Sequence, residues 1–240
     1  MNHNSPVTLI TGASQGLGRE LVRLLARRGD RLVLTARGSE ALAAAADELR
    51  ASTDVLALPG DVADRTHAER LVRTALERFG RIDVLINNAS TIGPSPMPPL
   101  ATYPLEAIAD VLQTNVVAPL RLIQLVLPGM QARGAGLIVN VTSDAGVQAY
   151  PGWGGYGMSK AALEHLSRVL AAELEGSGIR VYVVDPGDMN TQMHRDAEPG
   201  VDISYLPGPE AVAPSIVALL EQETAPFGRF EAQALLPLGG

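Results

Sequence analysis

Short apolar segments alternate with longer segments of helical spacing along the whole 240-residue chain. The short segments are continuous runs of Val, Leu, Ile and Ala, which is typical of strands buried on both faces of a parallel sheet. The predicted strands lie at 7–11, 31–36, 55–58, 82–87, 137–142, 180–185 and 232–236. The predicted helices lie at 16–28, 40–51, 65–79, 105–133, 156–174 and 209–222.

This alternation predicts an α/β fold with a doubly wound, seven-stranded parallel sheet and helices on both of its faces. Crossovers between parallel strands are right-handed, and ligands of such folds bind at the carboxyl ends of the strands. No repeat, low-complexity tract or linker divides the chain, so we predict one domain over 1–240. Two stretches rich in Pro and Gly, 92–101 and 186–209, are predicted to be loops where a substrate enters.

Composition and charge exclude several classes of protein. Hydrophobic residues make up 46% and charged residues 19% of the chain, which is typical of globular and not of disordered proteins. A net charge of −7 disfavours nucleic acid as a partner, because binding it requires the neutralisation of phosphates. The start of the chain does not read as a signal peptide, and no apolar stretch approaches the roughly 20 residues that span a bilayer. We therefore expect a cytoplasmic protein with no membrane partner.

The chain contains no cysteine, which excludes disulfides, thiolate metal ligands and a cysteine nucleophile. Its four histidines, His3, His67, His165 and His194, are far apart in sequence and lack the spacing of metal ligands, so no metal is expected. Any chemistry therefore depends on hydroxyl, amide and charged side chains.

A glycine-rich turn, TGASQGLG, follows the first predicted strand and opens the first predicted helix. Unpaired N–H groups at the start of a helix, together with the positive end of its dipole, bind phosphate. Three glycines alone are compatible with an ordinary strand-to-helix turn, but their place in the first βα unit favours a dinucleotide site. The residues expected to contact the dinucleotide here are Gly12, Ser14, Gln15, Gly16, Leu17 and Gly18.

The end of the second predicted strand bears on which dinucleotide binds. An acidic residue at this place accepts hydrogen bonds from a ribose 2′-hydroxyl, but this chain has Ala36 followed by Arg37. A guanidinium binds a 2′-phosphate, which a carboxylate would repel, although a solvated surface arginine is the alternative. The sequence therefore favours NADP(H) over NAD(H).

Lys160 is the only lysine of a chain that otherwise uses arginine for its basic residues. Tyr156 lies four residues earlier, so the two side chains share one face of a predicted helix. A free phenol has a pKa of about 10, and a shift to neutrality requires about 4 kcal/mol. An ammonium about 5 Å away at an effective dielectric near 20 supplies about 3 kcal/mol. Lys160 is therefore predicted to lower the pKa of Tyr156, the candidate general acid/base.

Taken in order, these motifs resemble those of the short-chain dehydrogenase/reductase family. The resemblance covers about residues 7–236 and implies a Rossmann fold with a cofactor half at about 1–90 and a catalytic and substrate-loop half at about 91–240. Ser143 precedes Tyr156 by 13 residues, as the family's serine does, and Asn115 matches the fourth member of its catalytic tetrad. The other matching motifs are Asp61-Val62, Asn87-Asn88-Ala89, Tyr156-x-x-x-Lys160 and Pro186-Gly187 followed by Thr191.

The resemblance implies hydride transfer between a nicotinamide and a carbonyl or alcohol carbon, with Tyr156 moving the proton. Ser143 would donate a hydrogen bond to the substrate oxygen. Asn115 would hold a water that relays protons to Lys160, through its side chain or a freed carbonyl; the alternative is a buried amide satisfied locally. Gln15 departs from the basic residue that many NADP-preferring members carry. Cofactor contacts are expected from Arg37, Asp61, Val62, Asn88, Ala89, Tyr156, Lys160, Pro186, Gly187 and Thr191.

The sequence thus predicts an NADP-dependent oxidoreductase that interconverts a ketone or aldehyde and the corresponding alcohol, assembled as a homodimer or homotetramer. Two alternatives stay open. A dinucleotide-binding sensor without turnover would lack a member of the tetrad, whereas all four are present here. An epimerase on the same scaffold would need more chain after the last strand for a substrate domain.

Overall fold

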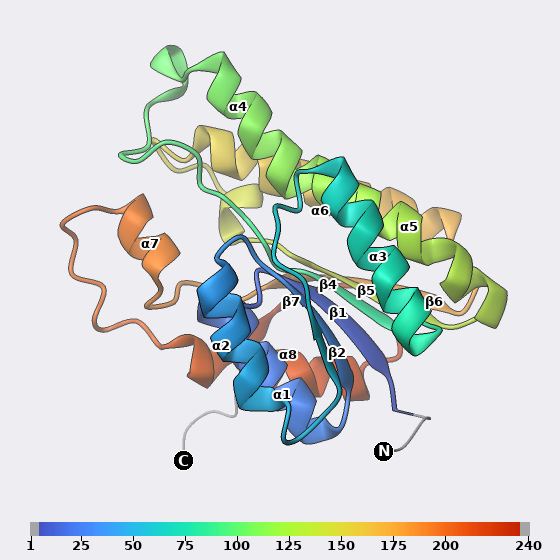
Figure 1. Ribbon diagram of the computed structural model, residues 1–240. Coiled ribbons are helices and arrows are strands. Elements are labelled where there is room, and N and C mark those ends of the chain that lie inside the picture. Colours follow the sequence, from blue (N-terminus) through green and yellow to red (C-terminus); the bar gives the residue numbers. More distant parts are fainter. Residues whose placement is uncertain (1–4, 236–240) are drawn as a thin grey trace.

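The computed structural model describes residues 5–235. Seven parallel strands form one sheet in the order β3-β2-β1-β4-β5-β6-β7 (Figure 1). The strands are β1 (Val7–Thr11), β2 (Arg31–Thr35), β3 (Val55–Ala57), β4 (Val84–Asn87), β5 (Gly136–Val141), β6 (Ile179–Asp185) and β7 (Phe227–Glu231). The order reverses between β1 and β4, which is the point where such sheets bind ligands. The predicted seven-stranded doubly wound fold is confirmed.

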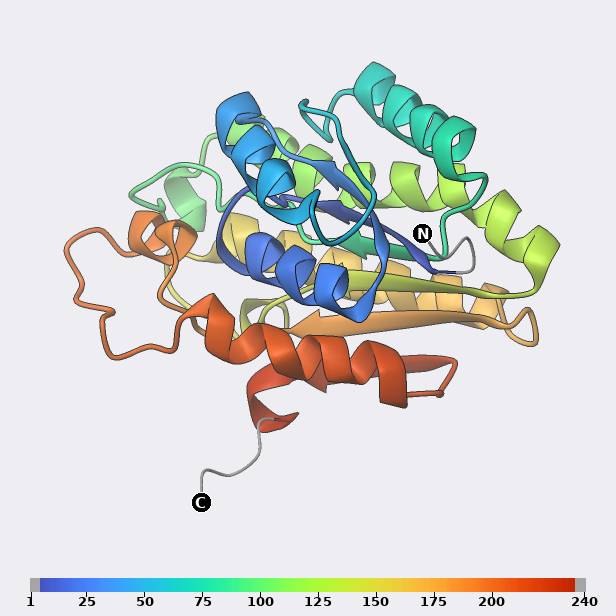
Figure 2. The same ribbon diagram turned by 60° about the horizontal axis from the view of Figure 1, so that its bottom comes forward.

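Helices cover both faces of the sheet (Figures 1 and 2). Helices α1 (Gly16–Arg28), α2 (Ser39–Leu49) and α8 (Pro209–Gln222) pack on one face, and α3 (Arg65–Phe79), α5 (Ala118–Arg133) and α6 (Gly154–Glu173) on the other. Successive strand residues belong to opposite cores: Leu9 and Ile138 pack with α3, α5 and α6, whereas Ile10 and Val139 pack with α1, α2 and α8. Both faces of each strand are therefore apolar, which explains the continuous apolar runs of the sequence.

The last strand lies earlier than predicted. Residues Phe227–Glu231 form β7, whereas Ala232–Leu235 form a 3₁₀ turn, η4, and residue 236 lies outside the described residues. The strand carries Arg229 and Glu231, whose charges are paired in the structure. A search for apolar runs therefore passes over this strand and selects the Ala- and Leu-rich segment behind it.

The predicted helix at 105–133 is interrupted. It consists of α4 (Leu105–Leu112), a π-helical turn η2 (Gln113–Val117) and α5, and Asn115 lies within the π-turn. Such turns are frequent at functional sites. Leu105–Arg133 is long and apolar enough to span a bilayer, with 29 residues and a mean hydropathy of 1.3. In this fold its buried side packs against α3, α6 and the sheet.

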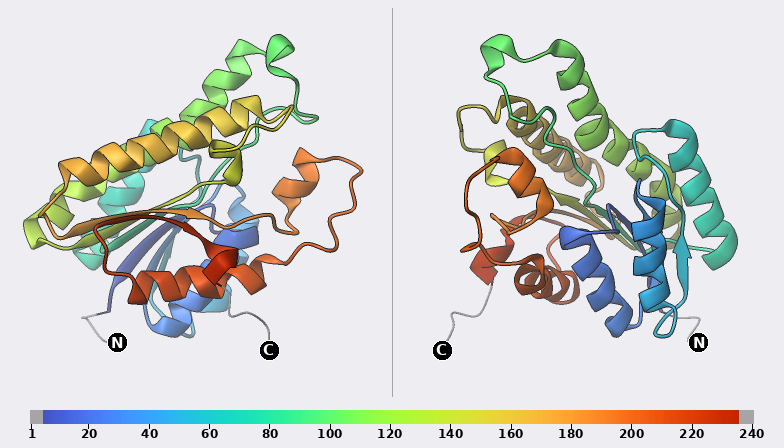
Figure 3. Two further views of the ribbon diagram at one scale, coloured as in Figure 1. Left: turned by 180° about the vertical axis from the view of Figure 1, so that it is seen from behind. Right: turned by 60° about the vertical axis from the view of Figure 1, so that its left-hand side comes forward.

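The two predicted loops lie over the same edge of the sheet (Figure 3). Residues 92–101 are irregular and lead into a 3₁₀ turn, η1 (Leu100–Thr102). The prediction of no element in 186–209 is wrong, because Gln192–Ala197 form a short helix, α7. The Thr191 hydroxyl caps this helix by accepting a hydrogen bond from the His194 N–H at 3.3 Å. Six residues are too few to show a helical period in the sequence.

Candidate active site

A cleft of about 730 Å³ opens at the carboxyl ends of the strands, beside the point where the strand order reverses. Three members of the predicted tetrad, Ser143, Tyr156 and Lys160, line it together. Asn115 lies outside the lining and is 1% exposed, whereas its neighbour Thr114 reaches the cleft. The predicted cofactor contacts that line the cleft are Gly12, Ser14, Gln15, Gly16, Leu17, Gly18, Arg37, Asp61, Val62, Asn88, Ala89, Tyr156, Lys160, Pro186, Gly187 and Thr191.

The glycine-rich turn brings backbone close to the cleft. Gly16 has φ +53°, a left-handed conformation that side chains rarely adopt. A Cβ atom at Gly18 would lie 2.2 Å from the Gly12 carbonyl oxygen, so only glycine allows α1 to pack this close to β1. Within the described chain, no side chain caps the start of α1 and its first turn holds no acidic residue. The N–H groups at this end are therefore available to an anionic ligand.

Thr11, which is not among the predicted site residues, joins the glycine-rich turn to the end of β4. Its hydroxyl accepts hydrogen bonds from the N–H groups of Asn88 and Ala89 at 3.0 and 2.9 Å. The Asn88 amide in turn donates to the Thr11 carbonyl at 2.9 Å. These bonds fix two neighbouring walls of the cleft. A hydroxyl residue at the end of the first strand, directly before the glycines, is the signal that would have identified it.

Ala36 is buried at the end of β2, and Arg37, which follows it, is exposed and lines the cleft. Among residues 5–235, Arg37 makes no ion pair and no side-chain hydrogen bond, unlike Arg19 and Arg23 of α1, which bind Glu48. The guanidinium at this corner of the cleft is thus free to bind an anion.

Tyr156 and Lys160 lie on one face of α6, as predicted. The Lys160 Nζ lies 5.3 Å from the centroid of the Tyr156 ring and donates a hydrogen bond to the Val141 carbonyl at 2.9 Å. Both side chains are buried, Lys160 to the extent that only 2% is exposed. The lysine is therefore a desolvated ammonium placed at the end of β5.

The electrostatics of this pair differ from the prediction. Burial raises the pKa of Tyr156 above its ordinary value, the charges of Asp185 and Asp144 raise it further, and the hydroxyls of Ser143 and Ser90 oppose the shift. Burial also lowers the pKa of Lys160 to about 8. The predicted lowering of the Tyr156 pKa by Lys160 is therefore wrong for the protein alone. The ammonium lies over the phenol ring and binds a carbonyl, while desolvation acts directly on the phenolate.

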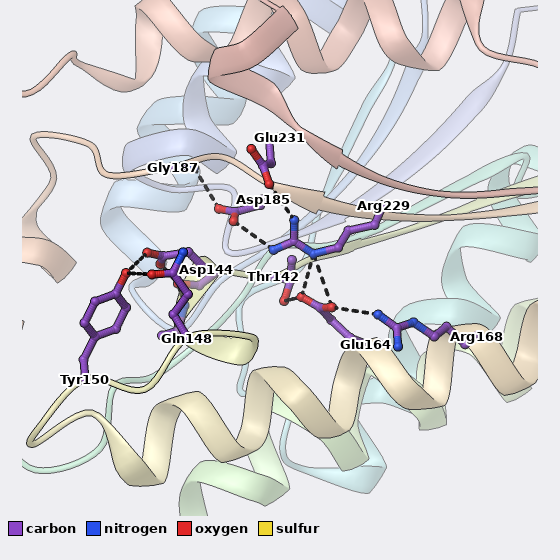
Figure 4. Close-up of polar contacts among 12 residues, drawn as sticks. Thr142, Asp144, Gln148, Tyr150, Glu164, Arg168, Asp185, Gly187, Arg229 and Glu231 are labelled. Carbon is purple, nitrogen blue, oxygen red and sulfur yellow. Dashed lines mark hydrogen bonds and ion pairs between the residues drawn. The ribbon is translucent and has the colours of Figure 1, made fainter.

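Ser143 follows β5 and faces the cleft. Its hydroxyl donates to the Asp144 carboxylate at 3.0 Å and accepts from the Ala145 N–H at 3.2 Å, so it caps the 3₁₀ turn η3 (Asp144–Gly146). Asp144 also accepts a hydrogen bond from the Tyr150 hydroxyl at 2.6 Å (Figure 4). A substrate oxygen would have to replace Asp144 as the acceptor for the serine hydroxyl.

Asn115 is bonded entirely within the protein. Its Oδ1 accepts from the Thr91 N–H at 2.9 Å and from the Ser90 hydroxyl at 3.1 Å, and its Nδ2 donates to the Thr91 carbonyl and the Ser159 hydroxyl. The side chain thus fastens the π-turn to the chain after β4 and to α6. Any water held at this turn would depend on its backbone carbonyls.

Apolar side chains pack with Tyr156 in a small buried cluster. Ile92, Ala145 and Ala197 are buried against it, with Trp153 and Met193 packed at their edge. The rings of Trp153 and Tyr156 meet edge to face at 5.8 Å. The Ser95 hydroxyl donates to the Asp196 carbonyl at 2.6 Å, which joins the two entrance loops. The substrate side of the cleft is therefore an apolar wall made by both loops.

Residues 5–235 contain no group of three or more His, Asp or Glu side chains that could hold a metal ion. A buried ionic network does lie beside the cleft, and it has no motif in the sequence. Arg229 of β7 binds both Asp185, at the end of β6, and Glu164 of α6 (Figure 4). Glu164 follows Lys160 by four residues, so the spacing of Tyr156, Lys160 and Glu164 along one helix face is the signal that could have found it.

Comparisons with known proteins agree with this arrangement. The short chain dehydrogenase family profile matches residues 6–202. The chain is 38% identical over 191 residues to the 2-(R)-hydroxypropyl-CoM dehydrogenase of Xanthobacter autotrophicus, covering 79% of this chain and 76% of the relative. It is 37% identical over 198 residues to the rhamnolipids biosynthesis 3-oxoacyl-[acyl-carrier-protein] reductase of Pseudomonas aeruginosa, covering 79% and 75%.

Among solved structures, a short-chain dehydrogenase from Shigella flexneri complexed with NADP superimposes with a TM-score of 0.87. The two chains are 29% identical, and the match covers 96% of this chain and 98% of the other. Fold, cleft and sequence therefore agree, and the chain belongs to the short-chain dehydrogenase/reductase family of NAD(P)-dependent oxidoreductases.

Proposed function

We propose that this protein is an NADP-dependent oxidoreductase that interconverts a ketone or aldehyde and the corresponding alcohol, with Tyr156 as general acid/base. The observation that carries the proposal is the placement of Tyr156 and Lys160, both buried, in one cleft with the glycine-rich turn. A sensor without turnover has no need for a buried phenol and ammonium in contact. We further propose that it acts in the cytoplasm.

The cleft fits a dinucleotide. The unpaired N–H groups at the start of α1 would bind the pyrophosphate, which can approach the backbone at Gly16, where a Cβ atom would meet nothing closer than 3.9 Å. Arg37, free of acidic partners in the described chain, would bind the 2′-phosphate of NADP(H). The relative from Shigella flexneri, complexed with NADP, supports the same choice. Gln15 supplies no second positive charge for that phosphate.

When bound, the cofactor supplies or accepts the hydride. Tyr156 moves the proton: because burial keeps its pKa above the ordinary value near 10, the phenol is protonated at neutral pH and is suited to donate to a carbonyl oxygen. The Ser143 hydroxyl would turn from Asp144 to the same oxygen. Lys160, with a pKa of about 8, is mostly an ammonium at pH 7 and supplies a positive charge to the buried site. At neutral pH Tyr156 is therefore in the protonated form that carbonyl reduction requires, whereas alcohol oxidation requires the phenolate.

The apolar wall defines the class of substrate that we propose. Ile92, Trp153, Met193 and Ala197 offer no charged group to a substrate beside Tyr156. The two named relatives act on a hydroxyalkyl and on a 3-oxoacyl group, by their names. A carbonyl flanked by an apolar carbon chain is therefore the substrate class that the cleft supports best.

The proposal is tested by following NADPH consumption with a panel of apolar ketones and aldehydes. Tyr156→Phe removes the proton donor and should lower turnover by about 1000-fold, with the Kd for NADPH within about twofold of that of the natural protein. Tyr205→Phe, at a tyrosine that is 77% exposed and outside the cleft, is the matched control and should keep full turnover. NADPH binding without turnover of any carbonyl by the natural protein would favour the sensor.

A further inference from the structure

One guanidinium joins two buried carboxylates beside the proposed active site (Figure 4). Arg229 Nη2 lies 3.1 Å from Asp185 Oδ2, and its Nε lies 3.2 Å from Glu164 Oε1. Glu164 also accepts the Thr142 hydroxyl at 2.9 Å, and Asp185 Oδ1 accepts the Gly187 N–H at 2.9 Å. Both carboxylate side chains are at most 6% exposed. The planar fork of an arginine can bind two acids in fixed directions, which a lysine cannot do.

The two carboxylates differ in what they face. Asp185 lines the cleft together with Tyr156 and Lys160, whereas Glu164 lies outside the cleft lining and is held between β5, α6 and β7. Asp185 is thus the member of the network that can act on the site. Glu231 binds the same guanidinium at 3.1 Å but is 68% exposed, and so provides a natural control.

Strand register places Asp185 at the same edge of the sheet as the lysine ammonium. The Lys160 ammonium donates to the carbonyl of Val141 at the end of β5, and Val141 pairs with Val184 of β6. Asp185 directly follows Val184, at the same edge of the sheet. The ammonium is bound at the end of β5 and the carboxylate lies at the end of β6, so the two groups lie at the ends of adjacent parallel strands. A buried ammonium is destabilised by desolvation, and a nearby carboxylate offsets that effect.

Other charged groups surround this pair. They come from every element packed against it and are Asp144 of η3, Asp188 of the following loop, Glu164 of α6 and Arg229 and Glu231 of β7. Among the described residues, only the charge of Asp185 raises the pKa of Lys160 and so opposes the lowering of that pKa by burial. Burial raises the pKa of Asp185, and the Gly187 N–H and the charge of Arg229 oppose this shift and favour its ionised form.

We propose that Asp185 is a positioning residue that keeps the buried Lys160 ammonium charged, and that Arg229 holds Asp185 in place for this task. The assignment rests on the proposed function, in which Lys160 acts as an ammonium beside Tyr156. It adds a carboxylate and a guanidinium from the last two strands to the four residues of the tetrad. These two residues act through Lys160 and do not touch the reacting atoms.

The pKa of Lys160 can be measured directly, because Lys160 is the only lysine of the chain. Protein grown with ¹³C-labelled lysine gives one lysine signal, whose pH titration reports the pKa of Lys160 without any turnover. The natural protein should titrate at about 8. A unit charge within about 10 Å at an effective dielectric near 20 shifts a pKa by about one unit. In Asp185→Asn, which keeps the shape of the side chain, the midpoint should therefore fall by about one pH unit.

Glu231→Gln is the matched control, since it neutralises a solvent-exposed carboxylate bound to the same Arg229. Because solvent screens an exposed charge, its Lys160 midpoint should move by less than about 0.3 unit. Asp185→Ser serves as a second neutral variant, and Asp185→Glu should return the midpoint towards that of the natural protein. An unchanged midpoint in folded Asp185→Asn and Asp185→Ser, or an equal fall in Glu231→Gln, would overturn the assignment.

Kinetics separate this inference from the proposed function. If the natural protein reduces carbonyls, the loss of activity on the alkaline side of its pH profile should begin about one unit lower in Asp185→Asn. If it reduces none, the proposed function fails, and the lysine titration still decides whether Asp185 and Lys160 are coupled. A profile that keeps its position, with a lower maximum only, indicates a merely structural role and contradicts the assignment.

Discussion

Arg37 is the side chain that carries the proposed preference for NADP(H) over NAD(H). Replacing it with alanine removes a charge-assisted bond to a 2′-phosphate, which is worth roughly 1.5–3 kcal/mol. In Arg37→Ala the kcat/KM for NADPH should fall by about tenfold or more, while the kcat/KM for NADH stays unchanged. Steady-state rates with both reduced cofactors and one carbonyl measure this ratio.

Arg50→Ala is the matched control for that variant, because Arg50 is an exposed arginine at the end of α2 that pairs with Asp47 and does not line the cleft. It should alter neither cofactor. An equal loss with NADPH and NADH in Arg37→Ala would mean that this guanidinium does not distinguish the two dinucleotides.

At the scale of elements, Arg229 ties the last strand to α6 and β6. Without it, Asp185 keeps no salt-bridge partner among residues 5–235 and Glu164 keeps only Arg168, and breaking such a buried pair costs about 3 kcal/mol. Arg229→Gln should lower the free energy of unfolding by about this amount at pH 7, as measured by urea denaturation. Arg229→Gln combined with Glu164→Gln should recover part of the loss.

The pH dependence of that loss has a definite sign. Burial already holds the folded-state pKa of Asp185 above its ordinary value, and losing the cation raises it further, so the protonated form of Asp185 favours the fold. The stability of Arg229→Gln is therefore lost as pH rises through this raised value. The gap to the natural protein should widen from pH 4 to pH 7. A gap that is constant over this range would show that Arg229 contributes packing alone.

The layered fold could be predicted from sequence because buried parallel strands leave short apolar runs that alternate with segments of helical spacing. Segments whose polar groups are satisfied by distant partners leave no such pattern. Strand β7 carries Arg229 and Glu231, and their partners lie on β6 and α6 or within the strand itself. Likewise α7, with six residues, is stabilised by one Thr191 cap and by contacts of Met193 and Ala197.

In the candidate site, too, features set by local spacing could be predicted, whereas features set by distant contacts could not. Spacing placed Tyr156 and Lys160 on one helix face, because helical geometry is local. The shift of the Tyr156 pKa could not be predicted, since desolvation depends on how the whole cleft is packed. The bonds of Asn115 to Ser90, Thr91 and Ser159 also join segments far apart in the chain.

At the scale of the whole molecule, α4, α5 and α6 lie together in one layer (Figure 1). The exposed apolar side chains of this layer include Val117 of η2 and Val169 of α6. The family resemblance implies pairing through such helices, and we propose a homodimer or homotetramer built on this layer. Val169→Glu should shift the molar mass from light scattering after size exclusion to that of a smaller assembly.

Val201→Glu is the control, at a valine of similar exposure in the loop after α7. It should leave the molar mass unchanged. A natural protein that elutes as a monomer at all concentrations would contradict the proposed assembly, without bearing on the cleft, all of whose lining residues come from one chain.

Because the only lysine is buried, the rate at which it is chemically labelled reports local opening motions of the native protein. Acylating reagents meet no accessible lysine side chain on the native surface, so Lys160 reacts only during excursions that part α6 from the strand ends. The labelling rate of this one side-chain amine, measured by mass spectrometry, therefore gives the frequency of these local openings. A protein with many surface lysines would hide this signal under faster labelling elsewhere.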